Sequence, residues 1–70
     1  MFKITTQSVS SVTNREFQTR VEFEDDLTIK QIVNNLIDRT ESHEIYQIPE
    51  AVTVITHNGT SADITVITKI

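Results

Sequence analysis

Two segments near the start of the chain alternate between apolar and polar residues. Alternation that includes aromatic and β-branched residues is typical of strands with one solvated face. We therefore predict strands over residues 2–8 and 16–24, joined by a turn within VSSVTN, residues 9–14. The residues expected on the apolar side are Phe2, Ile4 and Thr6 in the first strand and Phe17, Thr19, Val21 and Phe23 in the second.

An antiparallel hairpin can place both of these apolar sets on one face. The register that does so pairs Phe2 with Phe23 and Ile4 with Val21. It also sets Lys3 opposite Glu22, a cross-strand pair of opposite charge. Since a slip of one residue would turn one apolar set to the other face, we predict this register.

The hydrophobic period changes to that of a helix in LTIKQIVNNLI, residues 27–37. Thr28 is the predicted N-cap, and Gln31 three residues later completes a capping box. Asp25 and Asp26 precede the helix, where its dipole favours negative charge. A helix is predicted over about residues 28–41. Its core-facing stripe follows the i, i+3, i+4, i+7, i+8 pattern and consists of Ile29, Ile32, Val33, Leu36 and Ile37.

The last third of the chain contains an irregular segment followed by two β-branched ones. Residues 42–50, SHEIYQIPE, show no clear period, and Pro49 excludes a continuing helix. We predict a loop there, with apolar residues tucked under the edge of the core. The segments AVTVITH and ADITVITKI predict strands over residues 51–57 and 61–69.

The turn between these two strands contains Gly59, the only glycine. A two-residue Asn58-Gly59 turn would pair Val52 with Thr65 and separate the apolar residues onto different faces. A three-residue loop, His57 to Gly59 with Gly59 left-handed, pairs Val52 with Ile64 instead. We predict the three-residue loop. Val52, Val54, Ile64 and Val66 would then face the helix, and Ile55 and Ile67 would lie on the outer face of the sheet.

The element order predicts a single α+β domain over residues 1–70, with the helix packed on one face of a four-stranded mixed sheet. A crossover helix would place the first and last strands side by side and parallel, in order 2-1-4-3 along the sheet. This element order, together with the passage FEDDLTIKQIVNNLID (residues 23–38), resembles the β-grasp fold of ubiquitin-like and bacterial immunoglobulin-binding domains. The chain ends in ITKI without a diglycine, so the resemblance implies no conjugation through the C-terminus.

Charge and composition narrow the function. The formal net charge is −4, and the six Lys and Arg residues are scattered singly, so we expect no direct nucleic-acid binding. There is no cysteine. No apolar run approaches the roughly 18 residues that a membrane span needs, and the N-terminus lacks a signal-peptide pattern. We therefore expect a soluble, cytoplasmic protein that does not bind membranes.

The sequence offers little catalytic or metal-binding chemistry. His43 and His57, with Glu41, Glu44 and Asp63 nearby, lack the local spacing of a zinc site. No nucleophile, base and orienting group are grouped in a recognisable pattern. We expect no metal, no cofactor and no enzymatic activity.

The leading hypothesis is a small non-catalytic interaction module that binds a protein partner or its own copy through the outer sheet face or an edge strand. The candidate partner-binding residues are Ile55, Ile67, Glu22, Glu24, Asp25 and Asp26. One alternative is an acidic inhibitor, encoded by a phage or mobile element, that imitates nucleic acid with the Glu22–Asp26 run. Another is a small-molecule site at a dimer interface.

Overall fold

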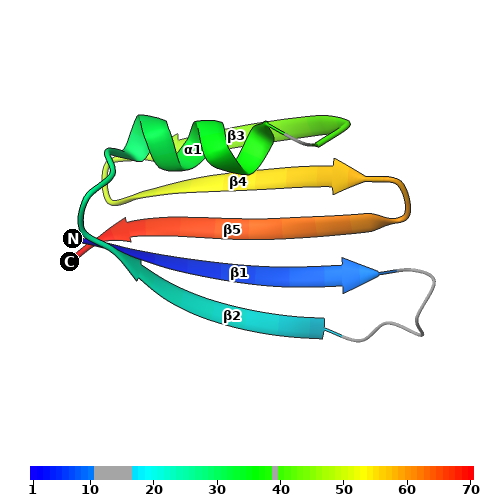
Figure 1. Cartoon of the computed structure of the whole chain (residues 1–70), viewed down its shortest axis with the longest axis horizontal. Helices are drawn as coiled ribbons and strands as arrows, with labels where there is room; N and C mark the ends of the chain where they lie inside the picture. Colours follow the sequence, from blue (N-terminus) through cyan, green and yellow to red (C-terminus); the bar gives the residue numbers. More distant parts are fainter. Residues whose placement is uncertain (11–16, 39) are drawn as a thin grey trace.

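The protein forms one antiparallel sheet of five strands with a helix on one face (Figure 1). The computed structural model describes residues 1–10, 17–38 and 40–70. Most of the predicted turn at residues 9–14 lies outside these ranges. The elements are β1 (Phe2–Ser10), β2 (Phe17–Glu24), α1 (Ile29–Ile37), β3 (Ser42–Ile48), β4 (Ala51–Asn58) and β5 (Ser61–Lys69). The sheet order is β2-β1-β5-β4-β3, and the predicted α+β class is confirmed.

Strand β3 occupies the segment that was predicted to be a loop. It pairs antiparallel with β4 from Ser42 opposite His57 to Ile48 opposite Ala51, and Pro49 and Glu50 form the turn between the two strands. Every residue of β3 is exposed. An edge strand that the helix does not bury needs no alternation of apolar and polar residues, so this segment carries no strand period. The prediction of four strands is therefore wrong.

The first and last strands lie side by side at the centre of the sheet, but they are antiparallel. Phe2 lies opposite Lys69, and Ser10 lies opposite Ser61. The extra strand β3 explains the difference, because it reverses the chain direction once more between α1 and β5. The predicted mixed sheet, with the parallel central pair that the β-grasp resemblance implies, is thus wrong.

The helix begins as predicted and ends earlier. The hydroxyl oxygen of Thr28 accepts a hydrogen bond from the Gln31 amide (3.2 Å), and Gln31 Oε1 accepts one from the Thr28 amide (2.9 Å). This capping box is confirmed. At the other end, the Thr40 hydroxyl donates to the Ile37 carbonyl (3.0 Å). Thr40 thereby satisfies a carbonyl of the last turn, and the chain then enters β3.

The core lies between α1 and the centre of the sheet. Among the described residues, its buried apolar side chains are Ile32 from α1, Val52 and Val54 from β4, and Ile67 from β5. Three threonines are buried with them: Thr6, Thr56 and Thr65. The hydroxyl oxygens of Thr6 and Thr65 lie 3.5 Å apart and form a buried hydrogen bond between β1 and β5.

The predicted register of the first hairpin is wrong by one residue. Phe2 lies opposite Glu24 and Ile4 opposite Glu22, so Lys3 faces Phe23 and not Glu22. The apolar side chains of Val21 and Phe23 therefore lie on the face of the sheet away from α1, where both are exposed. The prediction assumed that the apolar residues of the first hairpin all share the face covered by the helix, and β2 does not follow this rule.

The second hairpin combines a correct and an incorrect prediction. Gly59 has a φ of 63°, so its predicted left-handed conformation is confirmed. However, Asn58 pairs with Ser61, which leaves the two-residue loop Gly59–Thr60 in place of a three-residue loop. A positive φ at the first loop position is what the primed two-residue hairpin turns require. Val52 consequently lies opposite Ile67, and Ile64 turns to the other face.

Candidate interaction surface

Among the residues that the structure describes, no helix lies over the face of the sheet opposite α1. This open face consists of the odd-numbered described residues of β1, β2 and β4 and the even-numbered residues of β3 and β5. Five large apolar side chains on it are exposed: Val21 (48%), Phe23 (59%), Tyr46 (56%), Ile48 (59%) and Ile64 (36%). Large exposed apolar groups on one face of a small domain are a common mark of an interaction site.

Strand pairing places these side chains at both edges and in the middle of the open face. Val21 and Phe23 lie on the β2 edge, and Tyr46 and Ile48 lie on the β3 edge. Between them, one row across the sheet runs from Val21 through Thr5, Val66 and Thr53 to Tyr46. Threonine is abundant in this row, so the surface is a mixture of methyl groups, hydroxyls and aromatic rings.

Charge is scarce on the open face. Among its described residues, only Lys3 and Glu44 carry a formal charge. The Tyr46 hydroxyl donates a hydrogen bond to Glu44 Oε2 (3.2 Å). The negative charge of Glu44 disfavours the phenolate, and the hydrogen bond holds the phenol proton, so the pKa of Tyr46 is raised. The one acid on this face is thus tied to the β3 edge.

The predicted apolar contact residues do not both lie on this surface. Ile55 does, half-buried on β4 between Ile64 and Glu44 of the neighbouring strands. Ile67 does not: it is 1% exposed and packs on the helix side, between Ile4 and Val52. The two-residue turn at Gly59 causes this exchange, because it brings Ile67 and not Ile64 opposite Val52.

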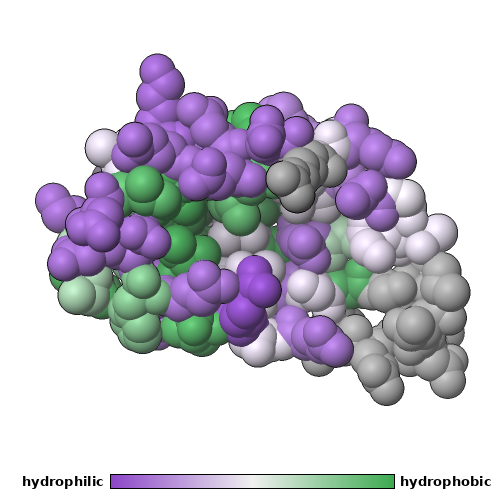
Figure 2. Space-filling view, viewed as in Figure 1, coloured by the Kyte–Doolittle hydropathy of each residue, from purple (hydrophilic) through white to green (hydrophobic). Residues whose placement is uncertain are grey.

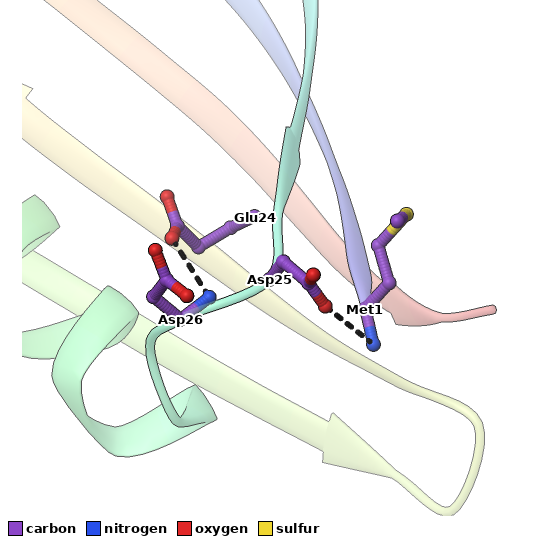
Figure 3. Close-up of polar contacts among 4 residues, drawn as sticks. All are labelled: Met1, Glu24, Asp25 and Asp26. Atoms are coloured by element: carbon purple, nitrogen blue, oxygen red, sulfur yellow. Dashed lines mark hydrogen bonds and ion pairs between the residues drawn. The ribbon is translucent and has the colours of Figure 1, made fainter.

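The predicted acidic run is dispersed by its local contacts. Glu22 and Glu24 lie on the helix side of β2, and Arg20 Nε pairs with Glu22 Oε1 at 2.6 Å. Glu24 Oε1 accepts a hydrogen bond from the Asp26 amide (3.2 Å), while Asp25 Oδ1 lies 3.9 Å from the Met1 amino group (Figure 3). Glu22 and Glu24 therefore lie on the face of β2 opposite the open face, and Asp25 and Asp26 follow in the bend before α1.

The helix side carries hollows, among them two that flank α1, because a helix about 10 Å wide cannot cover five strands spaced about 4.8 Å apart. One, of about 170 Å³, lies between α1 and β2 and is lined by Ile4, Ile32 and Leu36 with Arg20 and Glu22. Figure 2 shows hydrophobic residues on this side, bordered by hydrophilic ones. The other, of about 430 Å³, lies between α1 and β3 and is lined by Ile29, Val33, Ile45, Lys30 and Gln47, among others. Both are gaps beside the helix.

The candidate metal ligands are not brought together. His43 lies on the helix side of β3 and His57 on the open face of β4. Glu41 Oε2 instead accepts a hydrogen bond from the Gly59 amide (3.2 Å), which ties the turn after β4 to the start of β3. Within residues 1–10, 17–38 and 40–70 there is no group of three His, Cys, Asp or Glu side chains that could hold a metal ion. The same described residues contain no helix long and apolar enough to cross a membrane.

A scan against protein-family models gives no match, and comparisons with curated proteins and with solved structures give none either. Function must therefore be inferred from the surface itself. The sequence prediction included Ile55 but missed Val21, Phe23, Tyr46, Ile48 and Ile64. The sequence did contain one signal for them, the number of apolar residues. Strands β2, β3 and β5 together carry more apolar side chains than one short helix can cover.

Proposed function

We propose that the chain is a small non-catalytic interaction module that binds a protein through the open face. The observation that supports this is the exposure of five large apolar side chains on the face of the sheet opposite α1. Burying apolar surface contributes about 25 cal/mol per Å², so such a face is stabilised by a partner that removes it from water.

The composition of the open face favours a protein partner over other ligands. Its aromatic and aliphatic side chains, with hydroxyls among them and charge nearly absent, match the central part of protein–protein interfaces. A nucleic-acid site needs clustered Lys and Arg, and Lys3 is the only such residue among the described residues of this face. The exposed side chains project from a sheet, whereas a small-molecule site is concave.

Capture from an extract of the native host tests this proposal, with tagged chain as bait. Phe23→Lys and Ile48→Lys, at opposite edges of the open face, are each expected to abolish the capture of a partner. Ile45→Lys is the matched control, because Ile45 is 46% exposed and lies on the helix side of the same strand as Ile48. Circular dichroism of each variant establishes that it is folded.

Two outcomes would overturn the proposal. One is capture that survives both open-face substitutions. The other is capture that is lost on Glu24→Lys or Asp25→Lys but unaffected by Phe23→Lys. That result would support the nucleic-acid mimic instead.

A further inference from the structure

We propose that the partner on the open face is a second copy of this chain, with the two sheets packed face to face as a sandwich. This inference rests on the proposed binding role of the open face. Two sheets that pack in this way keep their strands within about 30° of each other and share a core about 10 Å thick. Each copy would supply one half of that core.

The size of the open face fits a dimer of identical chains. Five strands about 4.8 Å apart and about 8 residues long give a flat area of roughly 24 Å by 27 Å, or about 650 Å². A standard interface buries about 800 Å² of accessible surface on each partner. Because side chains corrugate the sheet, its accessible surface exceeds the flat area, and the whole face meets this size. A stable dimer must therefore use the face from the β2 edge to the β3 edge.

The arrangement of side chains is self-complementary. A two-fold axis in the interface and parallel to the central strand β5 lays the β2 edge of one copy over the β3 edge of the other. Phe23 and Val21 of one copy then meet the Tyr46 and Ile48 side of the second copy. The less bulky centre, with Ile64 and Val66 of β5, meets itself.

The charges agree with this arrangement. Lys3 on β1 would lie over β4 of the second copy, and Glu44 on β3 would lie over its β2. The described open-face residues of β4 and β2 include no Lys, Arg, Asp or Glu. No like charges are therefore opposed, although each copy has a formal net charge of −4. A face with one Lys and one Glu also selects neither a basic nor an acidic partner.

The small core of one copy gives a reason for association. Only four apolar side chains are buried among the described residues: Ile32, Val52, Val54 and Ile67. Domains of this size gain stability from association when their own core is limited. The open face then provides a second core, and the stability of the fold rises with protein concentration.

Sedimentation equilibrium of the purified chain tests the inference. The expected result is a dimer at micromolar concentration. Phe23→Lys and Tyr46→Lys are each expected to weaken it by about tenfold or more, since each buries an unpaired ammonium group. Ile45→Lys, next to Tyr46 but on the helix side, should leave the dimer intact. A dimer lost on Tyr46→Lys and unaffected by Phe23→Lys would indicate pairing through the β3 edge and overturn the sandwich.

A second measurement does not depend on how these variants fold. The chain has no cysteine, so Thr68→Cys introduces a single thiol on the open side of β5, next to the two-fold axis. A bifunctional thiol reagent about 10 Å long, the separation of packed sheets, should link two copies through it. Lys69→Cys, the next residue on the opposite face, is the control and should not be linked in this way. Equal linking of both variants would overturn the inference.

The two proposals fail differently. A chain that stays monomeric at all concentrations, but loses a captured host protein on Phe23→Lys, overturns self-association and leaves the proposed function standing. A monomeric chain whose capture is unaffected by open-face substitutions overturns both.

Discussion

Shortening Ile67 by one methylene tests which face of β5 belongs to the core. Ile67 is 1% exposed and packs under α1 between Ile4 and Val52. Removing a buried methylene costs about 0.8 kcal/mol in transfer free energy, and an unfilled gap brings the usual range for Ile→Val to about 0.5–1.5 kcal/mol. We expect Ile67→Val to lie near the top of this range, because the site is almost fully closed to solvent. A domain of this size loses about 4–8 °C of Tm per kcal/mol.

Ile64 provides a matched control on the same strand. It lies on the open face and is 36% exposed, so Ile64→Val should cost less than about half as much in an isolated chain. Thermal and urea denaturation should be followed at the lowest practical concentration, where association does not add to the stability of the open face. If Ile64→Val proves the more destabilising of the two, the three-residue turn predicted from the sequence holds and the register described above is wrong.

Three smaller effects follow from local contacts. Gly59→Ala should destabilise the fold by about 1 kcal/mol in urea titration; an added Cβ meets no atom within 4 Å, so the cost comes from the positive φ, and Gly59→Asn should cost less. Thr28→Ala should cost about 1 kcal/mol in thermal unfolding, because the capping hydrogen bond to the helix amide is lost; an unchanged Tm would contradict the cap. Glu44→Gln should lower the pKa of Tyr46 toward its ordinary value, because the negative charge that disfavours the phenolate is removed. Tyr46 is the only tyrosine, so the ultraviolet absorbance of tyrosinate reports this titration directly, and an unchanged midpoint would refute the contact.

Local signals in the sequence predicted the helix start and the left-handed conformation of Gly59 in the second hairpin. The capping box at Thr28 and Gln31 and the left-handed Gly59 are both present, because each depends on residues within a few positions. The positions of four strands were found because β-branched and alternating segments are strong local patterns. These features need no knowledge of distant contacts.

The register of the strands, and the face of the sheet on which each apolar side chain lies, could not be predicted in the same way. The sequence prediction of the helix-facing residues is correct for Val52 and Val54 but wrong for Val21, Phe23 and Ile64. A strand pattern shows which residues share a face, and it does not show which of the two faces the helix covers. The segment containing Tyr46 and Ile48 escaped detection because an edge strand exposed on both sides has no alternation. These omissions are the same residues that form the open face.

The antiparallel pairing of β1 with β5 determines how the chain can fold. β1 and β2 form one hairpin, β3, β4 and β5 form a meander, and contacts within each are short in sequence. The hairpin and the meander are joined by the pairing of β1 with β5, in which Phe2 lies opposite Lys69. The strands at the centre of the sheet are therefore far apart in the sequence. Closing so long a loop costs conformational entropy before any contact repays it, which slows folding. We therefore expect two local units to form first and the β1–β5 seam to close last. Until β1 and β5 pair, each of these two strands is an unpaired edge, although both lie at the centre of the complete sheet.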